Sequence, residues 1–187
     1  MQFIYFEMKT KINEYSNIII EIFSQAIDID NYLINDYNMI IFFNYSTGGI
    51  KELVESLASD IYSKFLVYES INYKNKEELE QALKIFLKVK DKLAYNKVYL
   101  DNKIFLSEIS EVTEDVKKLV LSEYYKDKEM YKTIKIFLEN NQNASNASKE
   151  LFLHRNTLNQ RLDKFQVITG FNVKNFIDGY LIYQIVK

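Results

Sequence analysis

His154, Arg155 and Arg161 lie within eight residues of one another, and they are the only histidine and arginines of the chain. Every other basic side chain is a lysine. A guanidinium group presents a planar fork of N–H donors that fits phosphate oxygens and the edge of guanine, whereas an ammonium group is a point charge. The segment is therefore a candidate binding site for an anionic partner, with chance clustering as the alternative interpretation.

The spacing of residues 155–169 predicts an amphipathic helix. At 100° per residue, one face carries the apolar side chains of Leu158, Leu162 and Phe165. The opposite face carries Asn156, Gln160 and Asp163, and the flanks carry Thr157, Lys164 and Asn159. Asn and Gln can bind adenine through two hydrogen bonds, and Arg can bind guanine in the same way. We expect one face in a protein core and the other available to base edges and phosphates.

A second helix is predicted at 144–151, and the turn between the two helices, 152–154, is very short. Asn143 or Ser145 can cap the first of these helices, and Gly170 follows the second where a C-terminal glycine is favoured. A tight turn between two helices, the second with a polar face, is the geometry that enters the major groove of DNA. Helices are also predicted at 130–139 and at 176–186, the last one closing the core or pairing with a second copy.

These patterns assign a role to each polar side chain. The helix at 144–151 is expected to cross the DNA backbone, with Ser145 as a backbone contact, and the helix at 155–169 is expected to enter the groove. Asn156, Thr157 and Gln160 are predicted to read bases, with Asn159 also in the DNA-binding set. Arg155, Arg161 and Lys164 are predicted to bind phosphate.

Residues 140–169 resemble the C-terminal helix-turn-helix of PucR/CdaR-type bacterial regulators, and more weakly the Fis-type module. The resemblance rests on His154-Arg155-Asn156-Thr157-Leu158 and Arg161-Leu162, together with Asn143-Ala144-Ser145, Ala147 and Thr169-Gly170-Phe171. It implies a transcriptional regulator that binds double-stranded DNA. The chain departs from the family pattern at Asn159, usually arginine, and at Gln160, often aromatic, and Asp163 adds a negative charge. These departures imply a lower phosphate affinity and a different preferred site.

The first part of the chain predicts an α+β fold. Strands are expected at 2–8, 32–34, 39–43 and 65–71, with helices at 12–26, 50–64 and 76–95 and short edge strands at 98–100 and 104–106. This β-α-β-β-α-β order is the ferredoxin-like plan, with an antiparallel sheet and helices packed on one face. We expect this domain at 1–107, a connecting helix at 108–128 and the all-α helix-turn-helix domain at 129–187.

The resemblance also implies that the first domain is a degenerate diguanylate-cyclase-like domain. The hairpin of true cyclases carries Gly-Gly-Asp-Glu-Phe, whereas the corresponding hairpin here reads Asn35-Asp36-Tyr37-Asn38-Met39. The glycines that admit a nucleotide and the acids that hold a metal are not reproduced. We therefore expect no enzyme activity, no cofactor and no metal. The domain is expected to mediate dimerisation, giving a homodimer, or to receive a signal from a small-molecule effector of unknown identity.

Composition and charge exclude several classes of protein and site. The net charge is −2, but residues 1–128 carry 16 Lys and 21 acidic residues, whereas residues 129–187 carry 6 Lys, 2 Arg and 5 acidic residues. The C-terminal part is thus mildly basic, and this asymmetry suggests two parts with different partners. The chain has no cysteine, which excludes disulfides and cysteine catalysis, and no apolar run of membrane-spanning length. With no signal-peptide pattern at its start, we expect a cytoplasmic protein without a membrane partner.

Alternative interpretations remain for several features. The two predicted domains can serve as a non-catalytic protein-interaction adaptor, or the first domain can retain nucleotide chemistry. Gly48-Gly49 can cradle a phosphate at a helix N-terminus, although a plain strand-to-helix turn is favoured. His154 can sense pH, although capping the turn or touching a phosphate is favoured.

Overall fold

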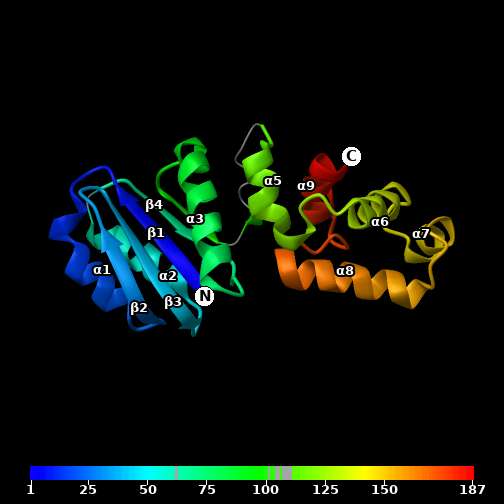
Figure 1. The fold of residues 1–187 in the computed structure, drawn as a ribbon. Coiled ribbons are helices and arrows are strands. Elements are labelled where there is room, and N and C mark those ends of the chain that lie inside the picture. The colour runs from blue at the N-terminus through cyan, green and yellow to red at the C-terminus, as the bar shows by residue number, and fades with distance from the viewer. Residues whose placement is uncertain (62, 101, 104–105, 107–110) are drawn as a thin grey trace. The chain divides into compact units, whose positions relative to one another are not determined.

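The computed structural model describes residues 1–61, 63–100, 102–103, 106 and 111–187. The chain divides into two compact units, Met1–Asp101 and Asn102–Lys187, which we describe separately. Figure 1 shows the sheet with its helices in unit 1 and a set of helices in unit 2. Among the described residues, no helix is long and apolar enough to cross a membrane.

Unit 1 is an α+β unit built on one sheet. Its strands are β1 (Gln2–Met8), β2 (Ile27–Ile34), β3 (Asn38–Ser46), β4 (Phe65–Glu69) and β5 (Lys97–Leu100). Its helices are α1 (Ser16–Phe23), α2 (Ile50–Asp60) and α3 (Lys76–Val89), with 3-10 turns at Ile12–Glu14 and Lys90–Lys92. The strand order is β2-β3-β1-β4-β5; the first three neighbouring pairs are antiparallel and β4 pairs with β5 in parallel.

Strand β1 lies in the middle of the sheet and is buried on both faces. Ile4, Phe6 and Met8 point into a core shared with α1 and α2, where Phe23 and Val54 are fully buried. On the opposite face, the ring of Phe86 from α3 stacks on Tyr68 with centroids 4.4 Å apart and meets the edges of Phe3 and Tyr5. The period-2 alternation of a strand therefore supplies two separate cores from one segment.

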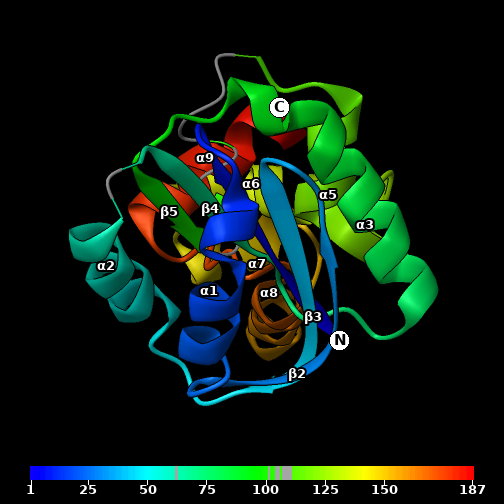
Figure 2. The same ribbon diagram turned by 90° about the vertical axis from the view of Figure 1, so that its left-hand side faces the viewer.

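Most expected elements of unit 1 are present, but β2 begins at Ile27 and not at residue 32, and the helix expected at 12–26 is an α-helix only over Ser16–Phe23. Packing and the edge strands also differ from the expectation. The helices do not all pack on one face: α1 and α2 cover one side of the sheet and α3 covers the other, as Figure 2 shows. The reason is that β1 and β4 carry large aromatic side chains on both faces, so both faces need covering. The first edge strand is found as β5. The second, expected at 104–106, is not found: Leu106 is helical, and residues 104–105 lie outside the described residues.

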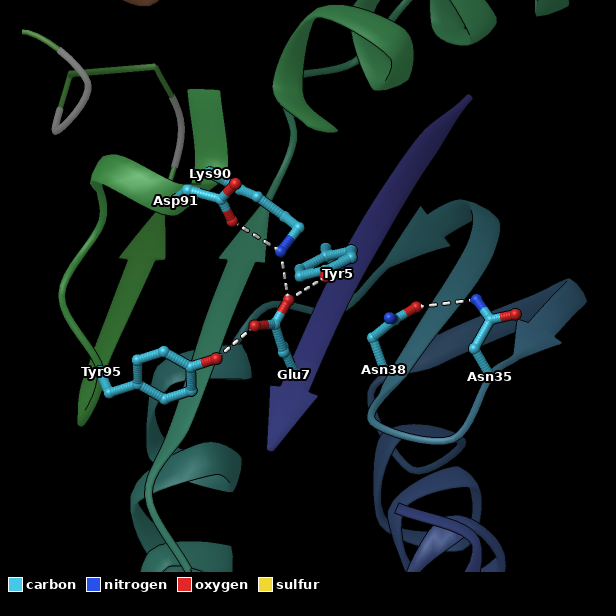
Figure 3. Close-up of polar contacts among 7 residues, drawn as sticks. All are labelled: Tyr5, Glu7, Asn35, Asn38, Lys90, Asp91 and Tyr95. Carbon is cyan, nitrogen blue, oxygen red and sulfur yellow. Dashed lines mark hydrogen bonds and ion pairs between the residues drawn. The ribbon is translucent and has the colours of Figure 1, made fainter. Parts of the chain in front are cut away.

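The hairpin between β2 and β3 turns through Asn35, Asp36 and Tyr37. The Asn35 amide group donates to the Asn38 side-chain oxygen at 2.9 Å (Figure 3), and the carbonyls of Asp36 and Tyr37 accept from the backbone N–H groups of Ile12 and Met8. The tip of the hairpin is thus hydrogen-bonded to the end of β1 and to the start of the 3-10 turn that follows it. Within the described residues, no three acidic or histidine side chains are grouped so as to hold a metal ion.

Gly48 and Gly49, before α2, both have positive φ, 86° and 81°. Glycine adopts this conformation without the steric cost that a β-carbon brings. The positive φ angles that the turn requires account for this pair of glycines.

A nearly buried carboxylate, Glu7, holds the end of α3 and the following loop against β1. One Glu7 oxygen accepts from Lys90 Nζ at 2.7 Å and from the Tyr5 hydroxyl, and the other accepts from the Tyr95 hydroxyl (Figure 3). Burial alone would raise the pKa of Glu7, but the hydrogen bonds from Lys90, Tyr5 and Tyr95 outweigh it and lower the pKa. These contacts join three segments through one ionised group.

We predict that Glu7→Gln lowers the free energy of unfolding by about 2 kcal/mol at pH 7, because Lys90 loses a charged hydrogen-bond partner. Since the pKa of Glu7 is lowered by folding, its contribution is complete above its ordinary pKa of 4.5 and is lost as pH falls through the folded value. Urea unfolding across pH 3 to 7 measures this.

Glu55→Gln is the control, because the Lys51–Glu55 pair is exposed and long at 3.7 Å, so its removal should be nearly neutral. Equal, pH-independent losses in the two variants would contradict the role assigned to Glu7.

Unit 2 is helical. Its elements are α5 (Glu114–Leu121), a 3-10 turn (Ser122–Tyr124), α6 (Lys128–Glu139), α7 (Ala144–Glu150), α8 (Arg155–Thr169) and α9 (Phe176–Val186). The core combines one apolar stripe from each long helix with Phe171 and Val173 of the loop after α8, which are fully buried. The helices α7 and α8 lie side by side, and α6 packs against both of them and against α9 (Figure 1).

Candidate nucleic-acid interface

Helix α8 buries the face that its sequence predicted. Leu158, Leu162 and Phe165 are 0 to 1% exposed, and the Phe165 ring lies 5.3 Å from the ring of Tyr124. Ala147 and Ser148 of α7 are also buried, and their small side chains allow α8 to approach closely. The rotation of α8 about its own axis is set by these contacts, so its polar face is directed away from the core.

Side-chain caps begin the helices of this unit. Asn143 caps α7 by accepting from the N–H groups of Ser145 and Asn146 at 3.0 and 3.1 Å, so Asn143 and not Ser145 is the cap. His154 caps α8, with Nδ1 accepting from the Asn156 N–H at 3.2 Å, which confirms the capping interpretation of this histidine. Each cap satisfies N–H groups that the first turn of a helix leaves without partners. The two helices are therefore held by caps on both sides of the turn.

The outward face of α8 carries Asn156, Gln160, Asp163 and Val167, all exposed, at the i, i+4, i+7, i+11 spacing of one helical face. We call these four residues the outer stripe. It extends over about 16 Å of helix, since each residue rises 1.5 Å. Thr157 and Asn159 lie at its margins and are half-buried, and Lys164 beside it is exposed. The stripe presents two amide side chains that can each donate and accept at a base edge.

The cations assigned to phosphate are in different situations. Arg155 at the first position of α8 and Lys164 are exposed, and neither forms an ion pair with another described residue. Arg161 is half-buried, and its guanidinium pairs with Glu129 of α6 at 2.7 Å. This differs from the expectation of a free phosphate ligand, because Arg161 lies on the flank of α8 next to α6. A phosphate contact by Arg161 stays a prediction that requires competition with Glu129.

Two further residues bear on this surface and were missed by the sequence pattern. Lys174, in the loop between α8 and α9, forms an ion pair with Asp163 at 2.6 Å, so the acid on the outer stripe has a cationic neighbour. Glu129 forms the pair with Arg161 described above. Glu129 lies 32 residues before Arg161 and Lys174 lies in the loop just after α8, so no periodicity within α8 signals either partner. Ser145, at the start of α7, is exposed as predicted.

The C-terminal unit matches a known family. Residues 130–183 match the family described as the PucR C-terminal helix-turn-helix domain. The match begins within α6 and ends within α9, so it includes both helices and the turn considered above. The chain therefore contains a helix-turn-helix domain of PucR type, in agreement with the resemblance found in its sequence.

Comparison with curated proteins gives two relatives. The chain is 32% identical over 145 residues to the uncharacterized protein YxkF of Bacillus subtilis (strain 168), an alignment that covers 72% of this chain and 48% of the relative. It is 38% identical over 52 residues to the carbohydrate diacid regulator of Escherichia coli (strain K12), covering 28% of this chain and 14% of that protein. The chain thus spans about half the length of the first relative and a small part of the second.

Among solved structures, the chain is similar to the regulator of polyketide synthase expression from Bifidobacterium adolescentis. The TM-score is 0.49 at 16% sequence identity, and the match covers 98% of this chain and 77% of that chain.

We predict that Asn143→Ala lowers the free energy of unfolding by about 1 kcal/mol, because two N–H groups of α7 lose their acceptor. Ser145→Ala is the matched control two residues later and should leave stability nearly unchanged. Thermal unfolding followed by far-ultraviolet circular dichroism measures both. A larger loss in the Ser145 variant would show that the cap has been assigned to the wrong residue.

Proposed function

We propose that this chain is a sequence-specific, DNA-binding transcriptional regulator of PucR type, with α8 in the major groove. The observation that carries the proposal is that α8 has one buried apolar face and one exposed polar face. Its leucines and phenylalanine are buried, whereas Asn156 and Gln160 are exposed in a domain of helix-turn-helix type. The printed name of the E. coli relative, a regulator, supports the same function.

In this proposal the base contacts come from the outer stripe and its margins. Asn156 and Gln160 pair with base edges, and Thr157 and Asn159 reach adjacent positions from the sides of α8. Arg155 and Lys164 bind phosphates, and Arg161 joins them when it leaves Glu129. Ser145, at the exposed start of α7, contacts the DNA backbone.

The proposed partner is double-stranded DNA bound by a homodimer. A single helix-turn-helix module buries a modest interface, so two copies supply the affinity and specificity that one lacks. The two half-sites are then about 10 base pairs apart, or a multiple of that spacing, because both recognition helices must meet the same side of the duplex. The protein would act in the cytoplasm, with a small-molecule effector.

For unit 1 we propose a ferredoxin-like, degenerate cyclase-like domain without enzyme activity. The order β2-β3-β1-β4 with antiparallel pairing supports the ferredoxin-like part. The hairpin at Asn35 to Asn38 supports the loss of activity, because its side chains bind each other and its carbonyls are occupied by the protein backbone. The proposed boundaries are 1–107 for this domain, 108–128 for a connector and 129–187 for the DNA-binding domain, whereas the compact units divide earlier, between Asp101 and Asn102.

Selection of bound oligonucleotides from a random pool, followed by gel-shift titration, tests the function. We expect the full chain to enrich a related set of duplexes and to bind the selected duplex more tightly than a scrambled one by about 1,000-fold or more, the lower end of known specificity ratios. No affinity for any duplex even at 50 mM salt would contradict the proposal and favour a protein-interaction adaptor.

The phosphate contacts are tested by the salt dependence of binding. We predict that Lys164→Ala flattens the slope of log affinity against log salt concentration by about 0.9, because one fewer counterion is released. Lys84→Ala, an exposed lysine of α3 in unit 1, removes the same charge and should leave the slope unchanged. Equal slopes for the wild type and Lys164→Ala would place Lys164 outside the interface.

A further inference from the structure

The turn between α7 and α8 places a bulky aromatic residue in a conformation that favours glycine. Phe152 has φ 54°. Its N–H donates to the Lys149 carbonyl at 3.2 Å, and the next N–H, of Leu153, donates to the Ser148 carbonyl at 2.9 Å. These two bonds form the Schellman motif that ends α7, and this motif requires a left-handed residue at the position of Phe152.

The same unit shows the usual solution to this requirement. Helix α8 ends at Gly170, with φ 79° and an N–H bond to the Gln166 carbonyl. Glycine takes this conformation freely, whereas a side chain with a β-carbon is strained there. Of the two helix ends that flank the proposed interface, α8 thus has the unstrained residue and α7 has the strained one.

Burial of the Phe152 side chain does not offset this backbone strain. It is 96% exposed, the most exposed of the large apolar side chains among the described residues. An exposed aromatic ring in a strained backbone position is unfavourable for the folded chain on both counts. Positive φ also occurs at Ser122, Lys126, Asn141 and Gln142 of the same unit, so it is the combination of this strain with an exposed aromatic ring that points to a function outside the folding of the chain itself.

The surroundings of Phe152 indicate which partner the ring meets. Lys149 lies three residues before it and Arg155 three residues after it, and both are exposed. His154, two residues on, caps the end of α8 that the proposed function directs into the groove. An apolar ring between two cations, next to the start of the recognition helix, fits a duplex better than the apolar surface of a protein, because phosphates lie beside the apolar parts of the DNA.

We propose that Phe152 is a DNA-contacting residue that packs on an apolar part of the duplex, either a thymine methyl group or the face of a deoxyribose. This inference rests on the proposed DNA-binding function. The strain at φ 54° and the exposed ring are retained because the contact forms only in the complex. Phe152 therefore adds affinity by apolar contact, separately from the charge of its two neighbours.

The test compares Phe152→Gly with the wild-type full chain on the selected duplex. Removing the strain should raise the melting temperature by roughly 2–4 °C, the shift expected for about 1 kcal/mol in a chain of this size. Affinity should fall by about fivefold or more, with an unchanged salt slope because no charge is lost. A variant that is more stable and yet binds DNA less tightly cannot be explained by damage to the fold.

Two controls complete the design. Tyr37→Ala removes an exposed aromatic ring from the hairpin of unit 1 and should leave DNA affinity unchanged. Replacing each thymine of the duplex by uracil in turn removes one methyl group. If the ring meets a methyl group, one replacement weakens binding of the wild type but not of Phe152→Gly; if it meets a sugar, no replacement separates the two proteins.

Equal affinity of the wild type and Phe152→Gly overturns the inference while leaving the proposed function intact. Equal DNA affinity with loss of transcriptional output would assign Phe152 to a protein partner, and this also overturns it. A lower melting temperature of the variant would show that the ring stabilises the fold, contrary to the argument. If the wild type binds no duplex, both the proposed function and this inference fail.

Discussion

The burial of Leu158, Leu162 and Phe165 is the constraint on which the proposed interface depends. These side chains lock α8 against the rest of unit 2, and a helix locked on one face has a defined opposite face. Burying a large apolar side chain contributes about 2 kcal/mol, so three of them oppose rotation of α8 strongly. The amides of Asn156 and Gln160 are thereby directed outward, although neither side chain has a hydrogen bond to another described residue.

Local hydrogen bonds then define where each helix begins. The chain has no proline and only four glycines, so its turns depend on polar side chains and on residues with positive φ. Asn143 and His154 cap α7 and α8, and between them the backbone turns sharply at Phe152. Caps on both sides of a short turn reduce the number of ways in which the two helices can be arranged. The proposed interface is therefore pre-organised, which lowers the entropic cost of binding.

Ion pairs adjust the charge of the same surface. Arg161 pairs with Glu129 and Asp163 pairs with Lys174, so one cation is held near α6 and one acid on the outer stripe is offset. Such partly exposed pairs contribute little to stability, but they determine which charges are available to a polyanion. Arg155 and Lys164 are left as the cations of α8 that form no ion pair with another described residue.

The sequence by itself determined most elements of both units and the inward face of α8, because the repeat of apolar residues at helical or strand spacing is a local property. It missed the start of β2 at Ile27 and predicted a strand where Leu106 is helical. It also indicated the helix-turn-helix, since His154 to Leu158 and Gly170 lie at the spacing that the PucR/CdaR-type pattern has. Only the tertiary structure placed α3 on the opposite face of the sheet from α1 and α2, paired Arg161 with Glu129, and brought Lys174 to Asp163. These outcomes depend on which segments meet in space, and a distance between residues 32 positions apart leaves no periodic trace in the chain.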